Sequence, residues 1–230
     1  MSRPRFLFIS GCNRSGTTWV GQLVDHHPHA RVESEVGYVR PRKPWIARDV
    51  IERWATSVPA GSYWRGWDID RVLRVALRGA IESVWLDTMK PGPHVRIIGD
   101  KAPLVYGEAA EQAHALFPDS LYIDVVRDGR DVAVSRVFKA LQQDKASQWH
   151  PDQEKHDRAR GWYIAGERRG EAPSLLTVDS VRALARTWTE AIDNGERAAS
   201  LWGDAFLRVR YEDLLDETRE HTARIYRHLD

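Results

Sequence analysis

The sequence has almost no cysteine, no excess of charge of either sign and no long hydrophobic run. Its single cysteine, Cys12, excludes an intramolecular disulfide and a cysteine-based metal cluster. Its 34 Lys and Arg residues nearly balance its 33 Asp and Glu residues, so no global field draws the chain to nucleic acid or to a membrane surface. No apolar stretch approaches the length that spans a bilayer. We therefore expect a soluble, cytoplasmic protein in which any anion site is built locally.

The length of 230 residues fits one domain, residues 1–230, that can bury a substantial core. Short apolar stretches with strand character alternate with segments of helical period, and no internal repeat interrupts them. This alternation predicts an α/β fold of three layers, with helices on both faces of a central, mainly parallel sheet of about five strands.

The N-terminal stretch carries the pattern on which the functional prediction depends. Residues 6–9 form an uninterrupted apolar run, Phe-Leu-Phe-Ile, which predicts a buried strand. A polar turn bounded by Gly11 and Gly16 follows, and the apolar spacing of residues 17–24 predicts a helix. Unpaired N–H groups at the start of such a helix attract anions, as does its dipole. The stretch predicts a phosphate-binding loop of the P-loop type; a strand, turn and helix without a ligand is the alternative.

This loop has no lysine at the position where nucleoside triphosphatases have one. The spacing of Gly11, Gly16 and Thr18 matches the pattern G-x-x-x-x-G-K-[ST], but Thr17 occupies the lysine position. That lysine reaches the β- and γ-phosphates, so its absence argues against ordinary ATP or GTP hydrolysis. The basic residue of the loop lies earlier, at Arg14. Such a loop suits a nucleotide whose reacting group is attached to its 5′-phosphate.

Residues 14–19, Arg-Ser-Gly-Thr-Thr-Trp, resemble the 5′-phosphosulfate loop of sulfotransferases that use 3′-phosphoadenosine-5′-phosphosulfate (PAPS). The family pattern is Pro-[Arg/Lys]-Ser-Gly-Thr-Thr, and Asn13 replaces its proline. The resemblance implies a P-loop nucleotide-kinase-like topology, with the 5′-phosphosulfate on the backbone of residues 15–18. Trp19 would stack on adenine or belong to the core. The cofactor-binding residues that the resemblance implies in this loop are Arg14, Ser15, Gly16, Thr17, Thr18 and Trp19.

A second motif follows the strand predicted at residues 120–126. Residues 127–135 resemble the family's 3′-phosphate motif, Arg-Asp-Pro-Arg-Asp-x-x-x-Ser, with Gly129 in place of proline. The resemblance assigns the 3′-phosphate to Arg127 and Ser135. Asp128 or Asp131 is expected to cap the helix that follows.

Two shorter segments also match the family. Residues 99–103, Gly-Asp-Lys-x-Pro, resemble a turn that follows the strand predicted at residues 95–99. The resemblance implies that Lys101 neutralises charge on the leaving phosphate, whereas a solvated turn lysine is the alternative. Residues 211–214 match the family's Tyr-Glu-Asp-Leu segment after the last predicted strand. Many family members have a glycine-rich basic segment near the C-terminus, and this sequence has none up to Asp230. Either a subfamily of shorter proteins or a truncation of this chain would explain the difference.

Two glutamates follow the first predicted helix, on a short extended segment at residues 30–39. Glu33 and Glu35 share a face if that segment is extended, and a solvated acidic edge explains them without a function. In sulfotransferases that act on tyrosyl or sugar hydroxyls, a glutamate at this distance after the loop serves as base. By this resemblance Glu35 is the general base, with Glu33 as the second choice.

Two polar segments rich in tryptophan have little periodicity. We predict an acceptor-side insertion at residues 40–67, or else a loop whose tryptophans pack on the core. For residues 145–174 we predict a lid or acceptor loop, with a disordered surface excursion as the alternative. The histidines at 26, 27 and 29 fit a polar helix end better than a metal cluster, because no carboxylate or cysteine pattern completes a zinc site.

The resemblance implies in-line transfer of a sulfuryl group from PAPS to a hydroxyl or amine, which leaves adenosine 3′,5′-bisphosphate. Glu35 would act as base, assisted by Lys101 and Arg14, and a small molecule or glycan would be the acceptor. No metal is expected, because basic side chains and backbone amides take its place. Neither nucleic acid nor a membrane is an expected partner. A P-loop nucleotide or small-molecule kinase and a non-catalytic adenosine-bisphosphate-binding protein are the alternatives.

Overall fold

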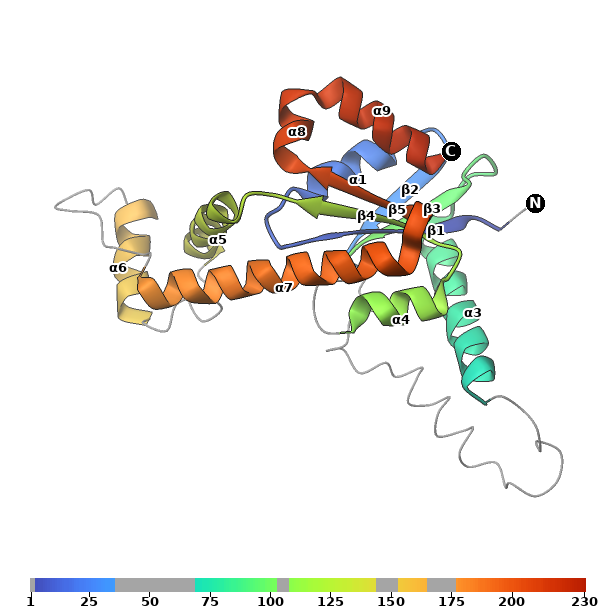
Figure 1. Ribbon diagram of the computed structural model, residues 1–230, viewed down its shortest axis with the longest axis horizontal. Helices are drawn as coiled ribbons and strands as arrows, with labels where there is room; N and C mark the ends of the chain where they lie inside the picture. Colours follow the sequence, from blue (N-terminus) through green and yellow to red (C-terminus); the bar gives the residue numbers. More distant parts are fainter. Residues whose placement is uncertain (1–2, 36–68, 103–107, 144–152, 165–176) are drawn as a thin grey trace, which may run out of the picture.

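A computed structural model of the chain describes residues 3–35, 69–102, 108–143, 153–164 and 177–230 (Figure 1). Its described strands form one five-stranded sheet of order β2-β3-β1-β4-β5, in which every neighbouring pair is parallel. The strands are β1 (Arg5–Gly11), β2 (Ala30–Ser34), β3 (Ile97–Lys101), β4 (Leu121–Val126) and β5 (Phe206–Arg210). The α/β fold with a central parallel sheet is confirmed.

Helices cover both faces of this sheet (Figure 1). One face is covered by α1 (Thr17–Asp25), α8 (Tyr211–Asp216) and α9 (Thr218–Leu229). The other face is covered by α3 (Ile69–Met89), α4 (Ala109–Leu116) and α7 (Val178–Trp202). Beyond the carboxyl end of β4, α5 (Gly129–Gln143) and α6 (Gln153–Ile164) pack on the N-terminal half of α7.

The apolar run of the first strand lies at the centre of both cores. Phe6 and Phe8 face the side of α3, α4 and α7, where their rings contact Trp85 and Phe117. Leu7 and Ile9 alternate with them and face the side of α1 and α9. A strand buried on both faces needs apolar residues at every position, which explains why residues 6–9 show no polar alternation.

The predicted turn around Lys101 was wrong. Asp100 and Lys101 belong to β3 and are buried, with Lys101 only 7% exposed. The strand continues through these polar residues because they pair with both neighbours, Ser34 with Lys101 on one side and Ile9 with Lys101 on the other. The position where β3 ends therefore depends on its pairing with β1 and β2, which cannot be predicted from the sequence of one segment.

The loop predicted at residues 145–174 contains a helix, α6. Ala159 of α6 is buried against α5 and α7, in a cluster with Val137 and Leu184. This contact stabilises a helix whose own sequence has little amphipathic pattern. The rest of the segment, and the insertion predicted at residues 40–67, lie outside the described residues.

The helix that follows the first loop has nearly the bounds that its apolar spacing predicts. The prediction covered residues 17–24, and α1 runs from Thr17 to Asp25, with Pro28 three residues beyond its end. Within the described residues, no helix combines the length and the apolar character needed to cross a membrane.

Candidate nucleotide-binding site

The loop between β1 and α1 has the backbone of an anion site. Gly16 precedes the helix with φ of 99°, a left-handed conformation that favours glycine, and a Cβ there would collide with the Tyr211 ring. The N–H groups of the first turn of α1 have no carbonyl partner within the helix, and Gly16 has no side chain to cap them. Arg14 also has a positive φ, 79°, which costs a non-glycine residue conformational energy.

The side chains of the loop divide into buried and exposed groups. Ser15 is fully buried, and its Oγ has no hydrogen-bond partner within the described part of the chain. Thr18 and Arg14 are exposed. Cys12 is buried against Val132 and Ala191, and burial raises the pKa of its thiol, so this cysteine is a packing residue. The loop thus offers backbone N–H groups, one unpaired buried hydroxyl and a basic side chain.

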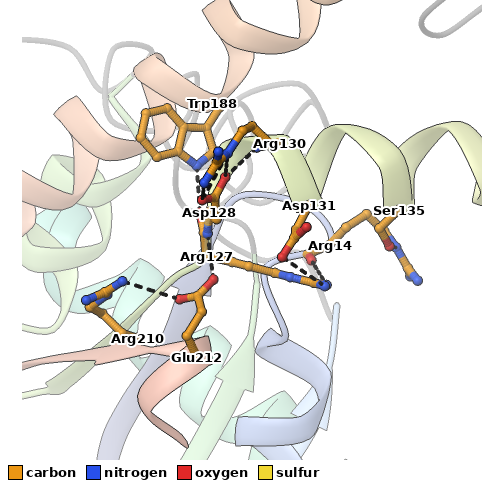
Figure 2. A network of polar contacts seen from close by, with 9 residues as sticks. All are labelled: Arg14, Arg127, Asp128, Arg130, Asp131, Ser135, Trp188, Arg210 and Glu212. Atoms are coloured by element: carbon orange, nitrogen blue, oxygen red, sulfur yellow. Dashed lines mark hydrogen bonds and ion pairs between the residues drawn. The ribbon is translucent and has the colours of Figure 1, made fainter. Parts of the chain in front are cut away.

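Three predicted site residues from two distant motifs are in contact (Figure 2). Arg14 Nε donates to Ser135 Oγ at 3.1 Å, across 121 residues of sequence. Arg127 Nη1 donates to the main-chain carbonyl of Arg14 at 3.3 Å. The two motifs therefore meet at the carboxyl ends of β1 and β4, which are neighbours in the sheet. Arg14 therefore contacts both Arg127, which lies just before α5, and Ser135, which lies within that helix.

The Arg127 guanidinium lies over an aromatic ring. Its Cζ is 4.3 Å from the centroid of Tyr211, and Nη2 lies 3.9 Å from the carboxylate of Asp131. Trp19 contacts the same tyrosine edge to face, with 5.7 Å between ring centroids. Tyr211 therefore joins the first loop to Arg127. Trp19 itself belongs to α1 and is partly buried against the core on that face of the sheet.

The turn that follows Arg127 is fixed by the cap of α5. Asp128 Oδ1 accepts from the main-chain N–H of Arg130 at 2.8 Å, the side-chain cap that the sequence predicted. The Arg130 side chain pairs with the same carboxylate, at 2.6 Å from Nη2 to Oδ2. These hydrogen bonds lower the pKa of Asp128 to about 2. Arg130 points at its own turn, as Figure 2 shows.

Lys101 and Glu35 form an ion pair at the neighbouring strand ends. Lys101 Nζ donates to Glu35 Oε1 at 3.0 Å, from a side chain that is 9% exposed to one that is 52% exposed. The stem of Lys101 runs past Gly21 of α1, where a Cβ would lie 3.7 Å from Cγ. The pair therefore lies next to α1, the helix that follows the loop of residues 11–16.

The two candidate bases have different positions. Glu35 lies just beyond β2 with φ of 58°, and its N–H donates to the Lys101 carbonyl at 2.9 Å. Glu33 lies within β2, opposite Asp100, and is exposed. The left-handed backbone at Glu35 turns the chain toward Lys101, so the two glutamates do not continue one regular strand.

Sequence reasoning missed two side chains that hold the second motif. Trp188 Nε1 donates to the Arg127 carbonyl at 2.9 Å, and Glu212 Oε1 accepts from the Asp128 N–H at 2.8 Å. Glu212 lies in a segment that the family resemblance marks, but no sequence signal links Trp188 to a residue 61 positions away. In the described parts of the chain, no three His, Cys, Asp or Glu side chains are grouped to hold a metal ion.

Solved structures with this fold carry sulfotransferase descriptions. The "Sulfotransferase Domain from the Curacin Biosynthetic Pathway" aligns with a TM-score of 0.60 at 17% identity, covering 99% of this chain and 75% of that one. The "Sulfotransferase from Alicyclobacillus acidocaldarius" aligns at 0.55 and 14%, covering 100% and 81%. The "Sulfotransferase Domain from the Synechococcus PCC 7002 Olefin Synthase" aligns at 0.56 and 15%, covering 98% and 72%. These likenesses show the fold.

The sequence was also compared with family profiles and with curated proteins. No curated protein matches the chain. The profile of the sulfotransferase family matches residues 4–230, which include the loop at residues 11–16, the motif at residues 127–135, the Lys101–Glu35 pair and the Tyr211 segment. This chain belongs to the sulfotransferase family.

Proposed function

We propose that the protein transfers a sulfuryl group from PAPS to a hydroxyl or amine acceptor. The observation that carries this proposal is the contact of Arg14 with Ser135 and of Arg127 with the Arg14 carbonyl. These contacts join the two motifs that resemble the family's 5′-phosphosulfate loop and 3′-phosphate motif, and such a pair suits a nucleotide phosphorylated at both positions. Adenosine 3′,5′-bisphosphate, the product, would occupy the same contacts.

The residues present fit such a nucleotide. The N–H groups of the first turn of α1 and the unpaired Ser15 hydroxyl offer donors to the 5′-phosphate. Arg127 and Ser135 offer a charged fork and a hydroxyl to the 3′-phosphate. Arg14 belongs to the first loop and contacts Ser135 of the second motif, so it can serve either phosphate. Gly16, Thr17, Thr18 and Trp19 complete the proposed donor site.

In this proposal PAPS supplies the sulfuryl group, and the protein supplies a general base and a positive charge near the leaving phosphate. Glu35 removes the proton of the acceptor hydroxyl, a contribution of about 10²–10⁴-fold in general acid–base catalysis. Lys101, nearly buried and paired with Glu35, supplies the positive charge that stabilises the leaving phosphate. A preorganised ammonium in a site that excludes water acts more strongly than one in solution. The proposed base and the Lys101 ammonium are in direct contact, because Lys101 Nζ lies 3.0 Å from Glu35 Oε1.

Thermal unfolding in the presence of nucleotides tests the donor assignment. A ligand that binds only the native state at a hundred times its Kd adds about 2.7 kcal/mol to the free energy of unfolding. We expect adenosine 3′,5′-bisphosphate to raise the Tm and ATP with Mg²⁺ not to do so. The reverse result would select the kinase alternative.

Sulfuryl transfer distinguishes an enzyme from a binding protein. The protein is incubated with PAPS and a panel of sugar, phenol and amine acceptors, and release of adenosine 3′,5′-bisphosphate is measured with and without acceptor. Acceptor-dependent release supports the proposal. Tight binding without transfer to any acceptor would contradict the catalytic part and leave a binding protein.

A further inference from the structure

The main chain that carries Arg127 is held by two side chains from outside its own loop. Trp188 of α7 donates from Nε1 to the Arg127 carbonyl at 2.9 Å. Glu212 of α8 accepts from the next main-chain N–H, that of Asp128, at 2.8 Å. Figure 2 shows the indole on one side of this peptide and the carboxylate on the other. The peptide between Arg127 and Asp128 therefore has both of its polar groups fixed.

The direction of the Arg127 side chain depends on this fixed peptide. Its guanidinium stacks on Tyr211, which leaves rotation in the ring plane open, and its other contacts are 3.3 Å to the Arg14 carbonyl and 3.9 Å to Asp131. Contacts of this length are weak, and a stacked contact has little directional preference. Among the described residues, the strongest restraints near Arg127 are thus those on its backbone.

Trp188 also fills the space beside the start of α5. A Cβ built on Gly129 would lie 3.1 Å from Cδ2 of the indole and 3.2 Å from Cε2, which is tight for carbon atoms. The same ring packs on the cluster of Cys12, Val132 and Ala191. One side chain therefore contacts the phosphate-binding loop, the first turns of α5 and the Arg127 carbonyl. It also accounts for glycine where the family motif has proline.

We propose that Trp188 is a positioning residue that aims Arg127 at the 3′-phosphate. This inference rests on the proposed function and adds a residue that neither sequence motif contains. The indole N–H fixes the Arg127 carbonyl, and the ring fixes the start of α5, which carries Ser135. Trp188 thereby sets the preference for a nucleotide with a 3′-phosphate over one without it.

The test compares adenosine 3′,5′-bisphosphate with adenosine 5′-monophosphate by calorimetric titration. Trp188→Phe keeps an aromatic ring and removes the N–H donor. We expect its affinity for the bisphosphate to fall about fivefold, as loss of one hydrogen bond predicts, with the affinity for the monophosphate unchanged. The readout is the Kd for the monophosphate divided by the Kd for the bisphosphate. A selective loss of bisphosphate affinity lowers this ratio, whereas a general loss of structure would weaken the binding of both ligands.

Trp202→Phe is the matched control. Trp202 lies on the same helix and donates from Nε1 to Ser120 Oγ at 2.9 Å, in the core rather than at the site. Loss of this N–H donor in Trp202→Phe should leave the Kd ratio unchanged. Gly129→Ala is a second variant, since its added methyl displaces the indole while the N–H remains; it should lower the ratio as Trp188→Phe does.

An unchanged ratio in Trp188→Phe, or an equal fall in Trp202→Phe, would overturn the positioning role. Should Trp188→Phe not fold, an unchanged ratio in Gly129→Ala would overturn it in the same way. A wild-type protein that binds both nucleotides equally would overturn the proposed donor, and the role of Trp188 with it.

Discussion

At the scale of single residues, the site depends on charged side chains that compensate one another. Lys101 is nearly buried, and a buried ammonium without a partner is costly. Glu35 supplies the partner, and its own side chain remains half exposed to solvent. The positive φ at Glu35 is the conformational cost of this arrangement. Strain and a buried charge at one point are typical of functional sites.

The base assignment is tested by Glu35→Gln, with Glu33→Gln as the control. If Glu35 removes the acceptor proton, kcat should fall about 10²–10⁴-fold, because glutamine cannot accept a proton at that oxygen. Binding of adenosine 3′,5′-bisphosphate should stay close to wild type, since neither nucleotide motif includes Glu35. Glu33→Gln should keep most of the activity. Full activity in Glu35→Gln, or the larger loss in Glu33→Gln, would contradict the assignment.

At the scale of elements, α7 links the site to the main core. Its N-terminal half packs on α5 and α6 through Leu184, and Trp188 holds the Arg127 loop. Its C-terminal end places Ala198 and Trp202 in the core under β1 and β4. A shift of this helix would therefore move the motif at residues 127–135 relative to the sheet. The start of the helix is fixed by Thr177, whose side chain accepts from the Ser180 N–H at 3.2 Å.

Thr177→Ala removes this cap. We expect the free energy of unfolding to fall by about 1 kcal/mol, because the Ser180 N–H loses its partner at the helix start. Urea denaturation followed by circular dichroism measures the change. Thr177→Ser keeps the hydroxyl and should recover most of the loss. A serine variant as unstable as the alanine variant would argue that the methyl group, and not the cap, is what matters.

At the scale of the whole molecule, a buried charge lies between the sheet and α7. Asp124 of β4 is 1% exposed, and its Oδ2 accepts from Arg208 Nε of β5 at 2.9 Å. Arg208 also pairs with Glu196 of α7. Burial raises the pKa of Asp124 to about 6, against the opposing effect of Arg208. The three groups join two strands and a helix in one polar network, which runs from buried Asp124 to exposed Glu196.

This buried carboxyl predicts a pH dependence of stability. Between about pH 4, the usual pKa of an aspartate, and pH 6, the folded protein keeps a proton that the unfolded chain has released. The Asp124 contribution to the free energy of unfolding therefore falls as pH rises through this window, by at most about 1.4 kcal/mol per pH unit. Asp124→Asn keeps an acceptor for Arg208 and cannot ionise.

Urea denaturation of wild type and Asp124→Asn from pH 4 to pH 7 measures this contribution. The difference between the two profiles isolates Asp124 from other carboxyls, such as Asp119, whose hydrogen bond from Arg78 lowers its pKa. We expect wild type to lose stability relative to the variant as pH rises, and to level off above pH 6. Parallel profiles over the whole range would show that Asp124 does not titrate in this window.

Much of the fold and part of the site could be predicted from local patterns. Period, apolar runs and glycine positions act over a few residues, so they predicted the strands, the loop at residues 11–16 and the cap at Asp128. They could not predict that β3 continues through Lys101, because the neighbouring strands decide this. Nor could they predict α6, which depends on packing against α5 and α7.

The sequence by itself determined the alternation of strands and helices, the glycine-bounded loop, and the hydroxyl and basic residues that its two motifs contain. Only the tertiary structure decided which of them meet: Arg14 with Ser135, Lys101 with Glu35, and Trp188 with the Arg127 carbonyl. The physical reason is one of range. Backbone preference and hydrophobic period act on neighbours in sequence, whereas these pairs are brought together by the order of parallel strands and by the helices packed across them.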